Sequence, residues 1–238
     1  MIINTRHGRM NIRHSQDYIS KTLLEQEEYE WYVVDIVSKL SAGYKTGTIL
    51  DIGANIGIVC IPIAKQYPDY QVYAFEAQVY VADMLEENIK LNNLNNIAVH
   101  SYALGENACT ISIAHPKYDE AENIGAFSLD PYVIEQSEIA RGHGEYESIP
   151  VHILDDMQFD QPIRCIKLDV EGYEERILLG GLETLKKHNY PPIVYELWSY
   201  NNWWKQNANN LRDLLESLGY KIVTHGDTAI AIYEKLPS

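Results

Sequence analysis

A glycine-rich turn is the first segment whose residue types and spacing could support chemistry. It reads Asp51-Ile52-Gly53-Ala54-Asn55-Ile56-Gly57 and begins at the carboxyl end of the apolar run 48–52. Glycines let the chain turn sharply and let a ligand approach the backbone, and the start of a following helix offers unpaired N–H groups. A pyrophosphate-binding turn would read G-x-G-x-x-G, and Asn55 stands where its middle glycine belongs. The turn therefore favours a ligand without a phosphate here, unless the glycines only serve a tight strand–helix connection.

An acidic residue follows this turn in the sequence at a spacing typical of nucleoside-binding folds. Glu76 ends the strand-like run 71–76 and lies 19 residues after Gly57. In folds with such a turn, a carboxylate at the end of the second strand receives the hydroxyls of a ribose. The turn and Glu76 together predict a nucleoside ligand.

Further carboxylates stand at the ends of two later apolar runs. Asp169 ends the run 163–169, and Glu196 ends the run 193–196. A carboxylate beside an apolar strand is costly to bury unless it is paired, which makes Glu196 a candidate functional group. Asp169 could instead be held by Lys167, which shares its face of a strand, or could cap the next helix. Glu171 and Glu174 fit either a functional role or the stabilisation of a helix N-terminus.

The composition limits the classes of partner. The chain has 238 residues, 46% of them hydrophobic, and a formal net charge of −15 with no dense Lys/Arg cluster. An acidic surface repels phosphate backbones, so we expect no nucleic-acid partner. No apolar run reaches the roughly 20 residues that span a bilayer, and the start lacks the apolar region of a signal peptide, so we expect a cytoplasmic protein with no membrane partner. Three scattered cysteines indicate neither a disulfide framework nor a zinc site.

The elements that would position these residues alternate between strands and helices. This alternation is typical of an α/β domain with a mostly parallel sheet, in which ligands bind at the carboxyl ends of the strands. No linker divides the chain, so we expect a single domain over residues 1–238, starting with a short hairpin. The expected strands are 48–52, 71–76, 97–103, 111–113, 149–154, 163–169, 193–196, 221–224 and 229–233; the expected helices have apolar faces within 33–40, 81–85, 178–185 and 211–218.

Three motifs in the same order resemble one known family. The motif D-I-G-A-N-I-G at 51–57, the motif A-F-E at 74–76 and the run I-K-L-D-V-E-G-Y-E at 166–174 are similar to those of the FkbM-type methyltransferases. The resemblance covers about 48–196 and includes A-L-G at 103–105 and I-L-D-D at 153–156, while T-R-H-G at 5–8 and Y-I-S at 18–20 are similar to one branch of the family. It implies a class I, Rossmann-like fold: a mostly parallel seven-stranded sheet with a terminal antiparallel hairpin and helices on both faces. The family-like core would span about 46–235, with an N-terminal extension over 1–45.

The resemblance also implies a cofactor, S-adenosylmethionine, and the roles of matching residues. The methionine part of the cofactor would lie among residues of the glycine-rich turn, namely Asp51, Gly53, Ala54, Asn55 and Gly57, and beside Asp169. Glu76 would bind the ribose hydroxyls, and Tyr102 and Ala103 would border the adenine. Asp169, Glu196 and Glu171 would be the catalytic candidates.

The expected reaction is O-methylation of a hydroxyl on a sugar or another small metabolite, so the partner would be a small-molecule or glycan acceptor. Holding donor and acceptor in line is the larger part of such catalysis, and Asp169 or Glu196 could remove the hydroxyl proton as a general base. A divalent metal bridging these two carboxylates is an alternative, but no third ligand can be named and no metal site is predicted. Two other functions stay open: a non-catalytic module that keeps the cofactor fold, and a nucleotide-dependent oxidoreductase. The sequence does not indicate the oligomeric state.

Overall fold

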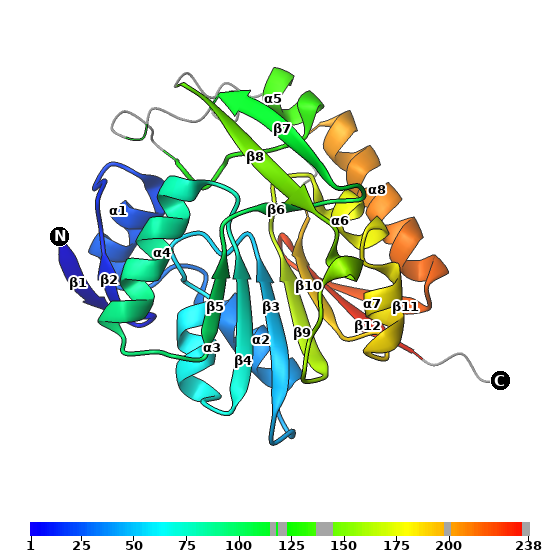
Figure 1. Ribbon diagram of the computed structural model, residues 1–238, viewed down its shortest axis with the longest axis horizontal. Helices are drawn as coiled ribbons and strands as arrows, with labels where there is room; N and C mark the ends of the chain where they lie inside the picture. Colours follow the sequence, from blue (N-terminus) through cyan, green and yellow to red (C-terminus); the bar gives the residue numbers. More distant parts are fainter. Residues whose placement is uncertain (115–117, 119–122, 137–144, 198–200, 235–238) are drawn as a thin grey trace.

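A seven-stranded sheet forms the centre of the protein (Figure 1). This computed structural model describes residues 1–114, 118, 123–136, 145–197 and 201–234. The strand order is β11-β12-β10-β9-β3-β4-β5. The strands are β3 (Gly47–Ile52), β4 (Tyr70–Phe75), β5 (Ile97–His100), β9 (Ile163–Leu168), β10 (Ile193–Glu196), β11 (Tyr220–His225) and β12 (Thr228–Tyr233). β12 pairs antiparallel with β10 and β11, whereas the other pairs are parallel. The expected seven-stranded, mostly parallel sheet with a terminal hairpin is confirmed.

Helices cover both faces of this sheet because successive residues of a buried strand point to opposite faces. On β3, Ile49 packs into one apolar cluster with α2 (Trp31–Ser41) and α3 (Cys60–Gln66). Its neighbour Leu50 packs into a second cluster with α6 (Glu174–Leu179), α7 (Leu182–Lys187) and α8 (Asn202–Ser217). α4 (Val79–Leu91) joins the first cluster. In the described part of the chain, no helix is long and apolar enough to cross a membrane.

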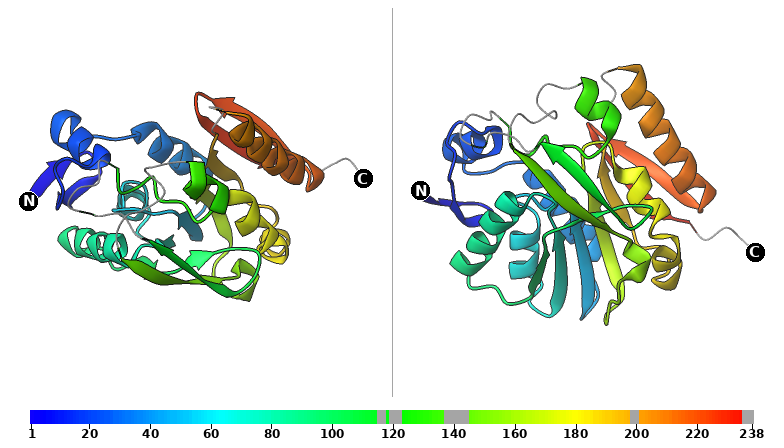
Figure 2. Two further views of the ribbon diagram at one scale, coloured as in Figure 1. Left: turned by 90° about the horizontal axis from the view of Figure 1, so that it is seen from above. Right: turned by 45° about the horizontal axis from the view of Figure 1, so that its top comes forward.

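A small second sheet lies to one side of the carboxyl ends of the central strands (Figure 2). Its order is β6 (Ala103–Leu104), β8 (Tyr146–His152) and β7 (Cys109–Ala114), and a short helix, α5 (Pro131–Gln136), precedes β8. The sequence predicted one strand over 97–103, but the chain leaves the central sheet after His100 and enters the second sheet at Ala103. The strand expected at 149–154 begins at Tyr146 and gives way to a 3-10 turn, Leu154–Asp156.

The single helix expected around 178–185 is instead two short helices. α6 ends at Leu179 and α7 begins at Leu182, with Gly180 and Gly181 between them. A Cβ on Gly180 would lie 2.1 Å from the carbonyl oxygen of Gly105, so the chain can pass this point only without a side chain. The break therefore follows from a contact with a residue 75 positions earlier.

The N-terminal segment forms the expected hairpin and an additional helix. β1 (Ile2–Thr5) pairs antiparallel with β2 (Gly8–Asn11), and β2 packs against α4. α1 (Tyr18–Gln26) follows, capped by Asp17, whose side chain accepts a hydrogen bond from the backbone N–H of Ser20. Apolar spacing did not reveal α1, because only Ile19 and Leu23 of its apolar residues are buried.

Candidate active site

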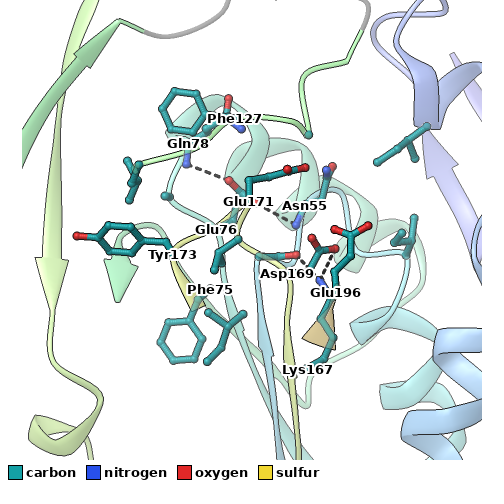
Figure 3. A pocket seen from close by; sticks show the side chains of 18 of the residues that line it. Asn55, Phe75, Glu76, Gln78, Phe127, Lys167, Asp169, Glu171, Tyr173 and Glu196 are labelled. Carbon is teal, nitrogen blue, oxygen red and sulfur yellow. Dashed lines mark hydrogen bonds and ion pairs between the residues drawn. The ribbon is translucent and has the colours of Figure 1, made fainter. Parts of the chain in front are cut away.

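A cavity of about 370 Å³ lies at the carboxyl ends of β3, β4, β9 and β10 (Figure 3). This is the edge at which parallel α/β sheets bind their ligands, and the volume falls in the range of roughly 300–1,000 Å³ found for ligand cavities. Of the sequence-predicted residues, the lining includes Gly53, Asn55, Glu76, Tyr102, Ala103, Asp169, Glu171 and Glu196. The fold thus brings together residues from the three motifs.

The glycine-rich turn wraps around the end of β4. The backbone N–H groups of Gly53 and Ala54 both donate to the carbonyl oxygen of Phe75 at 2.9 Å. Gly53 has φ +79°, and a Cβ at this position would lie 1.8 Å from the carbonyl oxygen of Asp169. The backbone of Asp169 therefore leaves no room for a side chain at position 53, and Gly53 also lines the cavity.

Three residues proposed from the turn do not line the cavity. Asp51 is fully buried in β3, and Ala54 is 1% exposed. A Cβ on Gly57 would meet the side chains of Ile61 and Leu85, so this glycine allows α3 and α4 to pack closely. The turn thus places these three residues in the core, behind the residues that line the cavity.

Glu76 faces the cavity from the end of β4 and is 7% exposed. Its Oε2 accepts from the backbone N–H of Asn55, and its Oε1 from that of Gln78, both at 3.0 Å (Figure 3). Burial raises the pKa of the Glu76 carboxyl to about 7, although these two N–H groups act in the opposite direction. Each carboxylate oxygen keeps a further lone pair, so the group can accept two more hydrogen bonds.

An apolar slot adjoins Glu76. Its walls are the side chains of Phe75, Tyr102, Leu104, Phe127 and Leu129. Tyr102 is held by His100, with 3.1 Å between its hydroxyl and Nδ1, and its ring lies 4.2 Å from that of His152. A slot bounded by rings and aliphatic groups next to a hydrogen-bonding carboxylate suits a flat heterocycle attached to a sugar.

The opposite end of the cavity is acidic. Asp169, Glu171 and Glu196 each bring a carboxylate oxygen to within 4.8 Å of the others. Burial and the neighbouring carboxylates of Asp169 and Glu171 raise the pKa of Glu196 well above its usual range. Burial and Asp169 also raise the pKa of Glu171 to about 8. The proximity of these groups therefore favours the protonated forms of Glu171 and Glu196.

Lys167 is the one cation that lines the cavity among the described residues. Its Nζ lies 3.3 Å from Asp51 Oδ1 and 3.4 Å from Asp169 Oδ2, and it donates to the carbonyl oxygen of Gly53 at 2.6 Å. Asp51 and Lys167 are register partners on β3 and β9, which explains the contact. Burial disfavours the ammonium, yet the two carboxylates outweigh burial and raise the pKa of Lys167. Lys167 therefore carries a positive charge between the carboxylates of Asp51 and Asp169.

The N-terminal segment supplies a wall of the cavity that sequence reasoning missed. Tyr18, Tyr29, Glu30 and Tyr32 line the acidic end, together with Asp227 from the β11–β12 turn. Burial, followed by the charge of Asp169, raises the pKa of Glu30. Tyr18 belongs to the Y-I-S motif at 18–20, whereas for the other residues of this wall the sequence offers only the density of aromatic residues at 29–32.

The sequence is similar to a known protein family and to a curated protein. The family model described as "Methyltransferase FkbM domain" matches residues 51–222. A curated relative, "Methyltransferase 1" of Beauveria bassiana (strain ARSEF 2860), is 25% identical over an alignment of 188 residues, and the match covers 73% of this chain and 72% of that protein.

Two solved structures share the fold. The precorrin-6y C5,15-methyltransferase of Geobacter metallireducens GS-15 has a TM-score of 0.52 and 14% identity, over 94% of this chain and 98% of that one. A putative caffeoyl-CoA O-methyltransferase of Staphylococcus aureus has a TM-score of 0.54 and 12% identity, over 93% of each chain. At these identities the likeness concerns the fold alone.

Proposed function

The chain belongs to the FkbM family of S-adenosylmethionine-dependent methyltransferases, and we propose that it methylates a hydroxyl oxygen of a sugar or another small polyhydroxylated acceptor. The observation that carries this proposal is the acidic end of the cavity, where Asp169 is ion-paired with Lys167 and brings a carboxylate oxygen to within 4.8 Å of those of Glu171 and Glu196. This group of side chains can hold a hydroxyl and take up its proton.

The described cavity fits the cofactor of this family. Glu76 has two free lone-pair positions for the ribose hydroxyls, and the apolar slot around Phe75 and Tyr102 fits the adenine. The positive charge of a sulfonium group suits the acidic end of the cavity, because carboxyl oxygens of Asp169, Glu171 and Glu196 converge there. S-adenosylmethionine has no phosphate, which agrees with Asn55 in place of a glycine in the turn.

We assign the proton transfer to Asp169. When bound, S-adenosylmethionine supplies a methyl group already activated by the sulfonium charge. Burial and the neighbouring carboxylates favour the protonated form of Glu196, so we assign it the role of a hydrogen-bond donor rather than that of the base. Asp169, whose Oδ2 lies 3.4 Å from the Nζ of Lys167, can accept the proton of the acceptor hydroxyl as its oxygen attacks. Glu171, opposite this pair, would then orient the acceptor.

The test is methyl transfer from radiolabelled S-adenosylmethionine to a panel of glycans, lipids and small alcohols. We expect label in hydroxyl-bearing sugars, with transfer lost in Asp169→Asn and kept in Glu183→Gln, a matched exposed carboxylate outside the cavity. Label only on amines or carbon atoms would contradict the assignment to oxygen.

Two controls address the other readings of the site. Calorimetry with S-adenosylhomocysteine and with NAD separates a methyltransferase from a nucleotide-dependent oxidoreductase, and binding without any transfer would leave a non-catalytic module. Addition of EDTA addresses the three carboxylates, because their spacing would also allow a divalent cation. Full activity in EDTA is the expected result.

A further inference from the structure

A surface groove of about 710 Å³ continues from the acidic end of the cavity. The two share four lining residues, Tyr18, Tyr29, Glu30 and Tyr32, so the groove leads directly to the place where an acceptor hydroxyl would meet the methyl group. The groove runs between α1 and the start of α2. A molecule bound at the acidic end can therefore extend along it towards solvent.

The side chains of this groove combine aromatic rings with hydrogen-bonding groups. Tyr18 is 55% exposed and meets the ring of Tyr29 edge to face at 5.9 Å, and Tyr32 is 39% exposed. Lys21 and Gln26 are exposed on the same groove. The faces of pyranose rings carry C–H groups that pack on aromatic rings, while their hydroxyls bond to amide, ammonium and carboxylate groups. This mixture is the chemistry that recognises a carbohydrate chain.

Backbone contacts fix this wall before any ligand arrives. His7 is buried, its Nε2 accepts from the backbone N–H of Tyr29 at 3.0 Å, and its Nδ1 lies 2.6 Å from the carbonyl oxygen of Ile58. Because Nε2 accepts, Nδ1 carries the proton and donates to Ile58. The guanidinium of Arg6 lies 4.2 Å over the ring of Trp31. A preformed wall lowers the entropy lost when a ligand binds.

We propose that this groove binds the sugar units that flank the methylated one, so that the acceptor is an oligosaccharide rather than a free monosaccharide. The inference rests on the proposed function, since it places the reacting hydroxyl at Asp169. It also assigns the recognition of the oligosaccharide to residues 18–35 of the protein, which precede the matched family domain at 51–222.

The experiment uses the protein with bound S-adenosylhomocysteine on a printed array of defined mono- and oligosaccharides. We expect binding to oligosaccharides that strengthens with chain length. Tyr18→Ala should weaken it by roughly threefold to tenfold, the effect of one stacking ring, and Lys21→Ala/Gln26→Ala should reduce the preference for longer chains. Tyr44→Ala is the matched control, because Tyr44 is 52% exposed and precedes β3 at the opposite edge of the sheet.

Binding only to monosaccharides, binding to no glycan on the array, or equal binding by wild type and the groove variants would each overturn the proposal. A second arm measures radiolabel transfer on the same array. Transfer of label to sugars that does not depend on the length of the oligosaccharide would refute the proposed role of the groove but not the proposed O-methyltransferase activity. Binding of S-adenosylhomocysteine without transfer to any hydroxyl would instead contradict the proposed function.

Discussion

Replacement of Glu76 by alanine should weaken the binding of S-adenosylhomocysteine in a pH-dependent way. At about pH 8 the carboxylate is ionised and can accept both ribose hydroxyls in addition to the N–H groups of Asn55 and Gln78. Loss of charged hydrogen bonds corresponds to about 1.5–3 kcal/mol, or roughly 10- to 150-fold in affinity.

The sign of the pH effect follows from the raised pKa. In the free protein Glu76 titrates at a pKa of about 7, and hydrogen bonds from a ribose favour the ionised form, so the pKa is lower in the complex. Below about pH 7 the wild type must therefore release a proton on binding, and its affinity falls as the pH falls, by up to about tenfold per unit. The variant lacks this group, so the difference between the two proteins should shrink towards about pH 6.

The assay is isothermal titration calorimetry with S-adenosylhomocysteine at several pH values, in buffers of different ionisation enthalpy to count released protons. Other carboxyls of the cavity, such as Glu171, titrate in both proteins, so the difference between wild type and variant isolates Glu76. Circular dichroism verifies that the variant is folded. Affinity within twofold of wild type at about pH 8, or a difference that does not change with pH, would refute the reasoning.

Three further outcomes are expected. Asp169→Asn should lower single-turnover methyl transfer by about 10²–10⁴, whereas Glu196→Gln, which resembles the protonated acid, should lower it less than about tenfold; equal losses would give Glu196 the role of base. Gly53→Ala should lower the free energy of unfolding, measured in urea, by more than about 2 kcal/mol, because the added Cβ would clash with the carbonyl oxygen of Asp169. A variant that is as stable as the wild type but fails to bind the ligand would contradict this expectation. Lys167→Met should cost about 3–5 kcal/mol in the same assay by leaving Asp51 buried without its cation, and unchanged stability would show that Asp51 is protonated.

The sequence was most informative where the information is local. The glycine-rich turn, the spacing to Glu76 and the acidic residue at the end of β9 each depend on the order of residues along one strand and its following turn. Because parallel strands place their carboxyl ends at one edge, these local patterns predicted the α/β class and the edge of the sheet where the cavity lies, whereas the resemblance to the family supplied the seven-stranded sheet with its terminal hairpin. Contact with Lys167 was the alternative interpretation of Asp169, and the structure contains this ion pair.

The sequence was least informative where distant segments meet. Asp51 was expected to surround a ligand, but the register of β3 and β9 pairs it with Lys167 inside the sheet. The break at Gly180 depends on the carbonyl oxygen of Gly105, and the approach of Tyr29 depends on His7. No periodicity records such contacts, because each joins residues whose separation along the chain has no fixed value.

The attachment of α1 has a consequence for how this protein could diversify. Ile19 and Leu23 anchor the helix in the core, whereas Lys21 and Gln26, which line the groove but not the cavity, are exposed. Substitutions at exposed helical positions usually change stability by less than about 0.5 kcal/mol. The exposed residues of α1 can therefore be substituted while the cavity at the strand ends stays unchanged. A new preference for acceptors can arise in this way without an unstable or inactive intermediate sequence.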